Sequence, residues 1–139
     1  MESYRFGLAQ LDEAAAWLIA HAGQPGVVGL SGPMGSGKTT LVAAVCRQLG
    51  VQQPVSSPTF TLLNVYDSPH GEVWHADAWR LEHPDEALDI GLLEWMERPL
   101  WGFVEWVERI EPWFPPGRPV VEIESPAPDE RILRLKPYI

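Results

Sequence analysis

One stretch of eight residues constrains the fold of this chain more than any other feature. Residues 32–39 read Gly-Pro-Met-Gly-Ser-Gly-Lys-Thr and match the pattern GxxxxGK[ST] without a gap. A chain with this content of glycine, lysine, serine and threonine matches the pattern by chance about once in a thousand times. The apolar run 27–30 before the stretch predicts a buried strand, and the apolar residues of 41–49 after it recur at helical spacing. A strand, a glycine-rich loop and a helix in this order indicate an α/β protein.

A glycine-rich loop in this position is a binding site for phosphate groups. Glycine lets the backbone curl so that successive N–H groups point inward, and the helix N-terminus adds a partial positive charge. Lys38 would reach the β and γ phosphates of a nucleotide, and Thr39 would offer its hydroxyl to Mg²⁺. The only other lysine, Lys136, lies far along the chain. We expect the nucleotide to be bound by Gly32, Pro33, Met34, Gly35, Ser36, Gly37, Lys38, Thr39 and Thr40.

The rest of the chain alternates helical and strand patterns, as expected for a single domain over residues 1–139. An amphipathic helix is expected over 11–22, and one or two short helices, interrupted at Gly91, over 84–97. The last two strand patterns alternate apolar and polar residues, which predicts an antiparallel pair at the sheet edge with one face in water. The expected strands are 27–30, 60–66, 72–77, 101–106, 120–124 and 131–136.

The charge balance argues against a protein that grips nucleic acid on its own. The chain has 10 Lys and Arg against 19 Asp and Glu, a net charge of −9, whereas each neutralised phosphate needs a basic side chain. Residues 82–111 hold nine of the acidic residues, and this segment is either a solvated face or a docking face for a basic partner. A single cysteine, Cys46, excludes an intrachain disulfide, and the longest nearly apolar run, 14–20, is far shorter than the ~18 residues that span a bilayer. We expect a soluble, cytoplasmic protein.

Acidic residues lie at the ends of two expected strands. Asp77 ends the strand 72–77, and Glu105 lies near the end of 101–106. Ligands of open α/β sheets sit outside the carboxyl ends of the strands, so both carboxylates are expected near the glycine loop. Nucleotide hydrolysis needs one group that binds Mg²⁺ and another that orients the attacking water, and the sequence alone does not rank the two acids for these roles. His75 shares a strand face with Asp77, but without a cysteine partner a zinc site is not expected.

Two further features bear on the nucleotide. Residues 56–61 place four hydroxyl groups beside a proline directly after the helix of the loop, where P-loop proteins often carry a segment that senses the γ-phosphate. Thr59 of this segment is a candidate contact to the nucleotide. The Asn-Lys-x-Asp element that reads guanine is absent, because the only asparagine, Asn64, is followed by Val65. ATP is therefore favoured over GTP.

Taken in order, these segments resemble the bacterial TsaE family, small P-loop ATPases required for making threonylcarbamoyladenosine in tRNA. The resemblance covers about residues 5–136, with Trp79 where tyrosine is expected and Val107 where proline is expected. The matching segments are 32–40, 56–61, His75-x-Asp77-x-Trp79-Arg80-Leu81, Val104-Glu105-Trp106 and Glu108-Arg109.

The resemblance implies a P-loop fold and a set of roles. The implied fold is an open mixed sheet, parallel at its centre with antiparallel edge strands, and with helices on both faces. Thr39 and Glu105 would hold Mg²⁺, Asp77 would position or activate the attacking water, and Trp106 would line the site. The segment 57–61 would act as a switch. The implied catalytic residues are Lys38, Asp77 and Glu105.

The function implied by the resemblance is hydrolysis of ATP that resets a transferase complex. The expected partners are TsaD-like and TsaB-like proteins, and tRNA is reached only through them, with no membrane involved. We expect an Mg²⁺-dependent ATPase that is weak alone, because only Arg80 looks available as an arginine finger. Two alternatives stay open on the sequence: a small P-loop kinase, and a nucleotide-gated binding module that does not need hydrolysis.

Overall fold

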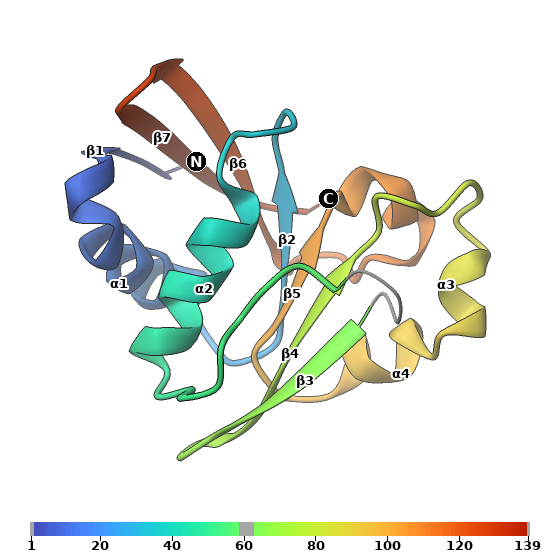
Figure 1. The fold of residues 1–139 in the computed structure, drawn as a ribbon. Helices are drawn as coiled ribbons and strands as arrows, with labels where there is room; N and C mark the ends of the chain where they lie inside the picture. Colours follow the sequence, from blue (N-terminus) through green and yellow to red (C-terminus); the bar gives the residue numbers. More distant parts are fainter. Residues whose placement is uncertain (1, 59–62, 139) are drawn as a thin grey trace.

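One mixed β-sheet runs through the middle of the molecule (Figure 1). The computed structural model describes residues 2–58 and 63–138, and within them the sheet has seven strands in the order β1-β7-β6-β2-β5-β4-β3. The strands are β1 (Glu2–Gly7), β2 (Val27–Ser31), β3 (Leu63–Ser68), β4 (Gly71–Asp77), β5 (Gly102–Glu105), β6 (Pro119–Ala127) and β7 (Glu130–Pro137). The helices are α1 (Leu11–Ala22), α2 (Lys38–Gln48), α3 (Glu86–Asp89) and α4 (Leu92–Glu97), with two 3₁₀ segments, η1 (Leu8–Gln10) and η2 (Val107–Trp113).

The strand directions confirm the expected mixed sheet. In the centre, β2 pairs in parallel with β5 on one side and with β6 on the other, and β4 is parallel to β5. The outer pairs β3/β4, β6/β7 and β1/β7 are antiparallel. Parallel strands end at the same edge of the sheet, so the last residues of β2, β4 and β5 lie close together at that edge.

The strand β1 was not predicted from the sequence, and it changes the position of the terminal hairpin. It pairs with β7 along its whole length, so the β6/β7 pair is not at the edge of the sheet as expected. Of the six residues of β1 only Phe6 is buried. A short edge strand with one buried side chain has no apolar run to reveal it, and its position is decided by pairing with a distant segment.

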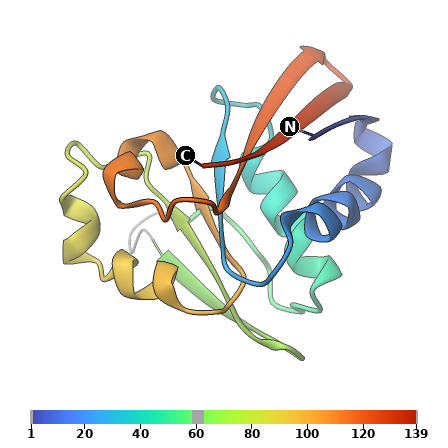
Figure 2. The same cartoon turned by 180° about the vertical axis from the view of Figure 1, so that it is seen from behind.

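Helices cover both faces of the sheet, as expected. The helices α1 and α2 pack on one face, and α3, α4 and η2 lie on the other (Figures 1 and 2). The strand β2 serves both layers, because Val28 and Leu30 contact the α1/α2 side while Val27 contacts the opposite side. A strand buried on both faces reads as an unbroken apolar run, which is how the sequence shows it. Over residues 2–58 and 63–138, no helix is long and apolar enough to cross a membrane.

The contact between β4 and β5 gives a first testable prediction, for the variant Gly102→Ala. Gly102 is the register partner of Trp74, whose ring is fully buried, and a Cβ at position 102 would lie 1.8 Å from a ring carbon of Trp74. Because a packed core does not yield, we expect Gly102→Ala to lower the free energy of unfolding by about 3 kcal/mol. Urea denaturation measures this.

A matched control for that prediction is Gly7→Ala, where the nearest atom to a new Cβ is 3.7 Å away. This change should alter the free energy of unfolding by less than about 0.5 kcal/mol. Equal stability of the two variants would show that Trp74 can move away from β5 without cost.

Candidate functional site

The loop that joins β2 to α2 takes a conformation that requires its glycines. At Gly32 the backbone φ is 156°, and a Cβ there would lie 2.8 Å from the carbonyl oxygen of Ile123 and 2.9 Å from Ser36 Oγ. Gly37, the residue before the helix, has φ 102°, in the left-handed region that favours glycine. The glycine spacing of the motif therefore follows from the shape of the loop, which curls over the N-terminus of α2 and makes an anion-binding cradle.

Lys38 lies inside this loop. Its side chain is 5 % exposed, and its ammonium donates hydrogen bonds to the carbonyl oxygens of Gly32 at 2.7 Å and Pro33 at 3.0 Å. The ammonium also lies 4.1 Å from the centre of the Trp106 ring. Burial lowers the pKa of the Lys38 ammonium, and the nearby carboxylates of Glu105, Glu108 and Asp77 act in the opposite direction. A buried cation held by neutral groups is ready to exchange them for phosphate oxygens.

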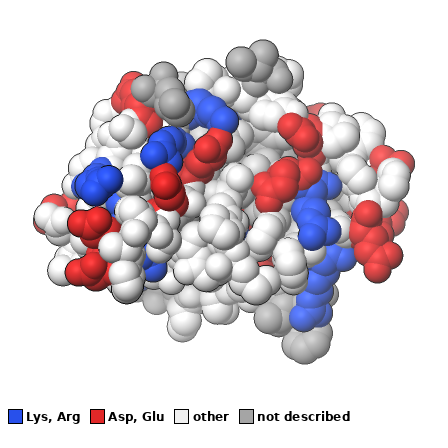
Figure 3. Space-filling view, turned by 90° about the horizontal axis from the view of Figure 1, so that it is seen from above, with Lys and Arg blue, Asp and Glu red and all other residues white. Residues whose placement is uncertain are grey.

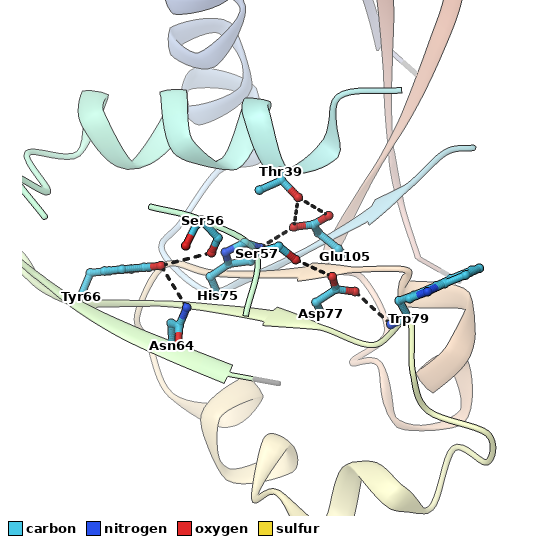
Figure 4. A network of polar contacts seen from close by, with 9 residues as sticks. All are labelled: Thr39, Ser56, Ser57, Asn64, Tyr66, His75, Asp77, Trp79 and Glu105. Atoms are coloured by element: carbon cyan, nitrogen blue, oxygen red, sulfur yellow. Dashed lines mark hydrogen bonds and ion pairs between the residues drawn. The ribbon is translucent and has the colours of Figure 1, made fainter. Parts of the chain in front are cut away.

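Glu105 is the carboxylate closest to the start of α2. The Thr39 hydroxyl lies 2.8 Å from both Oε1 and Oε2 of Glu105, and it donates its one proton to this carboxylate (Figure 4). Glu105 is the last residue of β5 and is paired in register with Leu30 of β2, which explains why it reaches the glycine loop. On its other side, Nε2 of the fully buried His75 is 2.6 Å from Glu105 Oε2.

Asp77 occupies the same edge of the sheet on the neighbouring strand. It ends β4 and is the register partner of Glu105. Its carboxylate is fixed by two donors, the Ser57 hydroxyl at 2.7 Å from Oδ2 and the Trp79 backbone N–H at 2.9 Å from Oδ1 (Figure 4). The two acids that the sequence places at strand ends therefore lie side by side.

An aromatic pair lies next to these carboxylates. Trp106 has φ 58° and ψ 46°, and among the described residues it is the only non-glycine residue with a positive φ. This turn directly after Glu105 places the ring over the Lys38 ammonium, and the ring centre of Trp79 is 4.5 Å from that of Trp106. A left-handed conformation in a bulky residue is uncommon and is often found at functional sites.

Lys38, the two carboxylates and the aromatic pair line one cleft of about 340 Å³. Figure 3 shows the face of the molecule above the carboxyl ends of the parallel strands, over which basic and acidic side chains are both distributed. The residues lining the cleft are Met34, Gly35, Gly37, Lys38, Thr39, Thr40, Asp77, Trp79, Glu105 and Trp106.

Most of the residues expected in the site meet in this cleft, and a few do not line it. Gly32 and Pro33 contribute carbonyl oxygens to Lys38 instead, and Ser36 faces a smaller cleft of about 200 Å³ on the other side of the loop. Thr59 lies outside the described residues.

Sequence reasoning missed Arg131 of β7, whose Nε donates to the Ser36 carbonyl oxygen at 3.0 Å and stabilises the loop. It also missed the contact of His75 with Glu105.

Comparisons with known proteins agree on one family. The family model described as "Threonylcarbamoyl adenosine biosynthesis protein TsaE" matches residues 7–133. The tRNA threonylcarbamoyladenosine biosynthesis protein TsaE of Bacillus subtilis (strain 168) is 37% identical over 120 residues, which are 86% of this chain and 75% of the relative. The protein of the same name from Nostoc sp. (strain PCC 7120) is 40% identical over 88 residues, which are 60% of this chain and 54% of the relative.

A solved structure shares the fold of this chain. The crystal structure of Bacillus subtilis YdiB superposes with a TM-score of 0.74 at 27% sequence identity, over 95% of this chain and 82% of that one. The family match covers the strands from β2 to β6 in full, together with the first half of β7, and includes the glycine loop, Asp77 and Glu105. The chain therefore belongs to the TsaE family of threonylcarbamoyl adenosine biosynthesis proteins.

Proposed function

We propose that this protein hydrolyses ATP with Mg²⁺ and that hydrolysis resets the complex that makes threonylcarbamoyladenosine in tRNA. The observation that carries the proposal is the convergence of the glycine loop, the Thr39–Glu105 pair and Asp77 on one cleft. Relatives named for this tRNA modification support the biological setting. Phosphate binding alone needs only the loop, whereas the two carboxylates at its mouth are the additional groups that hydrolysis requires.

The triphosphate is bound by the loop and by Lys38. Backbone N–H groups and the N-terminus of α2 supply a positive field for the phosphates. The Lys38 ammonium exchanges the carbonyl oxygens of Gly32 and Pro33 for phosphate oxygens, which are charged and therefore stronger acceptors.

The groups beside the loop suit Mg²⁺. Thr39 and Glu105 offer hydroxyl and carboxylate oxygens, the hard ligands that Mg²⁺ prefers, and Mg²⁺ in nucleotide sites takes one or two such protein ligands together with phosphate oxygens and water. These two residues would hold the ion. Bound there, Mg²⁺ supplies positive charge to the β and γ phosphate oxygens.

Asp77 orients the attacking water in this mechanism. Its two oxygens already accept hydrogen bonds from Ser57 and from the Trp79 N–H, which fix the plane of the carboxylate. Each carboxylate oxygen has a further lone pair that can accept a hydrogen bond from water. Water then attacks the γ-phosphorus as the bond to the β–γ bridging oxygen breaks, and ADP and inorganic phosphate leave.

We further propose that partner proteins complete the site. Among the described residues that line the cleft, Lys38 is the only cation. Arg109 donates to the Leu81 carbonyl oxygen and packs over the Trp79 ring, so it does not supply a second cation to the phosphates. A P-loop enzyme without an arginine at the γ-phosphate is slow. With a net charge of −9, the chain reaches tRNA in the cytoplasm through basic partners, for which TsaD-like and TsaB-like proteins are the candidates.

The products of the reaction test this proposal. With ATP labelled on the γ-phosphate and Mg²⁺, we expect ADP and free inorganic phosphate in equal amounts, slowly for the chain alone and at least about 10-fold faster with the partner proteins. Label on a small molecule or a protein would identify a kinase instead. Repeated rounds of tRNA modification with a non-hydrolysable ATP analogue would identify a nucleotide-gated binding module and contradict the need for hydrolysis.

A further inference from the structure

We propose that His75 is a positioning residue that fixes the Glu105 carboxylate in the orientation needed to bind the metal of the nucleotide. The proposal rests on the proposed function of the cleft. His75 does not line the cleft and would touch neither nucleotide nor water. It acts only through Glu105, from the neighbouring strand β4.

The geometry points to a specific role for His75. The side chain is fully buried, and its Nε2 is 2.6 Å from Oε2 of Glu105, which is itself only 3 % exposed. A carboxylate accepts hydrogen bonds, so Nε2 carries the proton of this bond. The other ring nitrogen, Nδ1, has no hydrogen-bond partner among the described residues. Within residues 2–58 and 63–138, the one polar contact that this buried ring makes is therefore the one to Glu105.

Burying a histidine with one unpartnered ring nitrogen lowers the stability of the folded protein. A buried polar nitrogen without a partner costs free energy, and an apolar side chain of similar volume would avoid that cost. Val73, two residues earlier on β4, packs against the same core on the α1/α2 side without any polar atom in its side chain. His75, on the same strand face, differs from Val73 in carrying a polar ring whose Nε2 contacts Glu105.

The two contacts of Glu105 come from different elements and leave it in the cleft wall. His75 approaches Oε2 from within the protein, and Thr39 donates from the start of α2, while Glu105 still forms part of the cleft wall (Figure 4). Two donors from different elements restrict rotation of the carboxylate about its side-chain bonds. Groups that hold a metal-binding carboxylate in this way change metal affinity or activity by about 10- to 100-fold when they are removed.

Three variants at one fixed pH test the proposal. His75→Leu removes the donor, His75→Gln places an amide N–H near the position of Nε2, and Val73→Ala removes buried volume from the same strand. The readouts are Mn²⁺ binding to the ADP-bound protein by electron paramagnetic resonance, ADP binding in EDTA, and kcat and KM for ATP. Thermal unfolding reports the stability of each variant.

We expect His75→Leu to weaken Mn²⁺ binding and lower kcat by about 10- to 100-fold, with metal-free ADP binding and KM changed by less than about threefold. His75→Gln should recover most of both losses. Val73→Ala should lose stability and keep wild-type Mn²⁺ affinity. Wild-type Mn²⁺ affinity in His75→Leu would overturn the proposal, as would an equal loss of affinity in Val73→Ala.

Two further comparisons keep the test decisive. If His75→Leu does not fold, His75→Asn replaces it. The shorter amide of asparagine reaches only the position of Nδ1 and therefore cannot donate to Glu105. Equal Mn²⁺ affinity of the Asn and Gln variants would overturn the proposal. Glu105→Gln separates this inference from the proposed function. If Glu105→Gln abolishes Mn²⁺ binding while His75→Leu has no effect, only the role of His75 fails. If neither variant has an effect, the metal site itself is elsewhere.

Discussion

Replacing Lys38 with alanine is expected to lower kcat/KM for ATP by about 10²- to 10³-fold, because the variant loses the one cation among the described residues that line the cleft. Lys38 is 5 % exposed, and its ammonium is held at the loop by carbonyl oxygens and by the Trp106 ring. Its charge therefore acts on the phosphates with little screening by water. Two measurements in the complex with the partner proteins divide this loss. The rate of phosphate release gives the change in kcat, and equilibrium binding gives the change in affinity for ATP.

The control for that variant is Lys136→Ala, which removes the only other lysine of the chain. Lys136 lies in β7, is exposed, forms an ion pair with Glu122 and does not line the cleft. This change removes the same charge from the protein, so a general effect of net charge would appear in both variants. Hydrolysis at the wild-type rate in Lys38→Ala would mean that the loop does not bind the reacting phosphates.

The sequence was sufficient for the parts of the site that depend on local pattern. The glycine spacing identified a loop whose shape requires glycine at Gly32, and the apolar run before it identified the central strand β2. Asp77 and Glu105 were placed at strand ends by the same local patterns. Because parallel strands end at a common edge, those local patterns also predicted that both acids lie near the loop.

The parts that were missed depend on which strands are neighbours. His75 meets Glu105 only because β4 lies next to β5 with Asp77 opposite Glu105, and a sequence does not state that register. The same holds for Arg131, which reaches Ser36 across the 95 residues that separate them. The left-handed backbone of Trp106 has no local signal either, since tryptophan rarely adopts it.

The acidic segment 82–111 also looks different in three dimensions. One of its nine acidic residues, Glu105, is buried in the site with Thr39 and His75, whereas residues such as Glu94 and Glu97 are exposed on the face that carries α4. Charge counted along the sequence therefore combined a buried carboxylate of the candidate site with carboxylates exposed on the surface. Burial, which depends on the tertiary structure, separates them.

The second large effect is expected for Glu105→Gln, which should lower kcat by about 10²- to 10³-fold and leave ATP binding without metal within about threefold of wild type. Glutamine keeps the volume of the buried side chain, and its carbonyl oxygen still accepts from Thr39 or His75. What it loses is the negative charge and the second acceptor oxygen. Phosphate release measured over a range of Mg²⁺ concentrations gives the size of the effect.

The neighbouring carboxylate Glu108 provides the control, because it also lies close enough to Lys38 to affect the pKa of its ammonium, yet it is exposed and outside the cleft. Glu108→Gln should change kcat by less than about threefold, since an exposed charge is screened by water.

A slow Glu105→Gln that recovers full activity at high Mg²⁺ would locate the defect in metal binding. A slow Glu105→Gln at every Mg²⁺ concentration would show that the Glu105 charge is also needed in the transition state. Unchanged hydrolysis in Glu105→Gln would instead mean that the Thr39–Glu105 hydrogen bond is structural and that the metal is held by other groups.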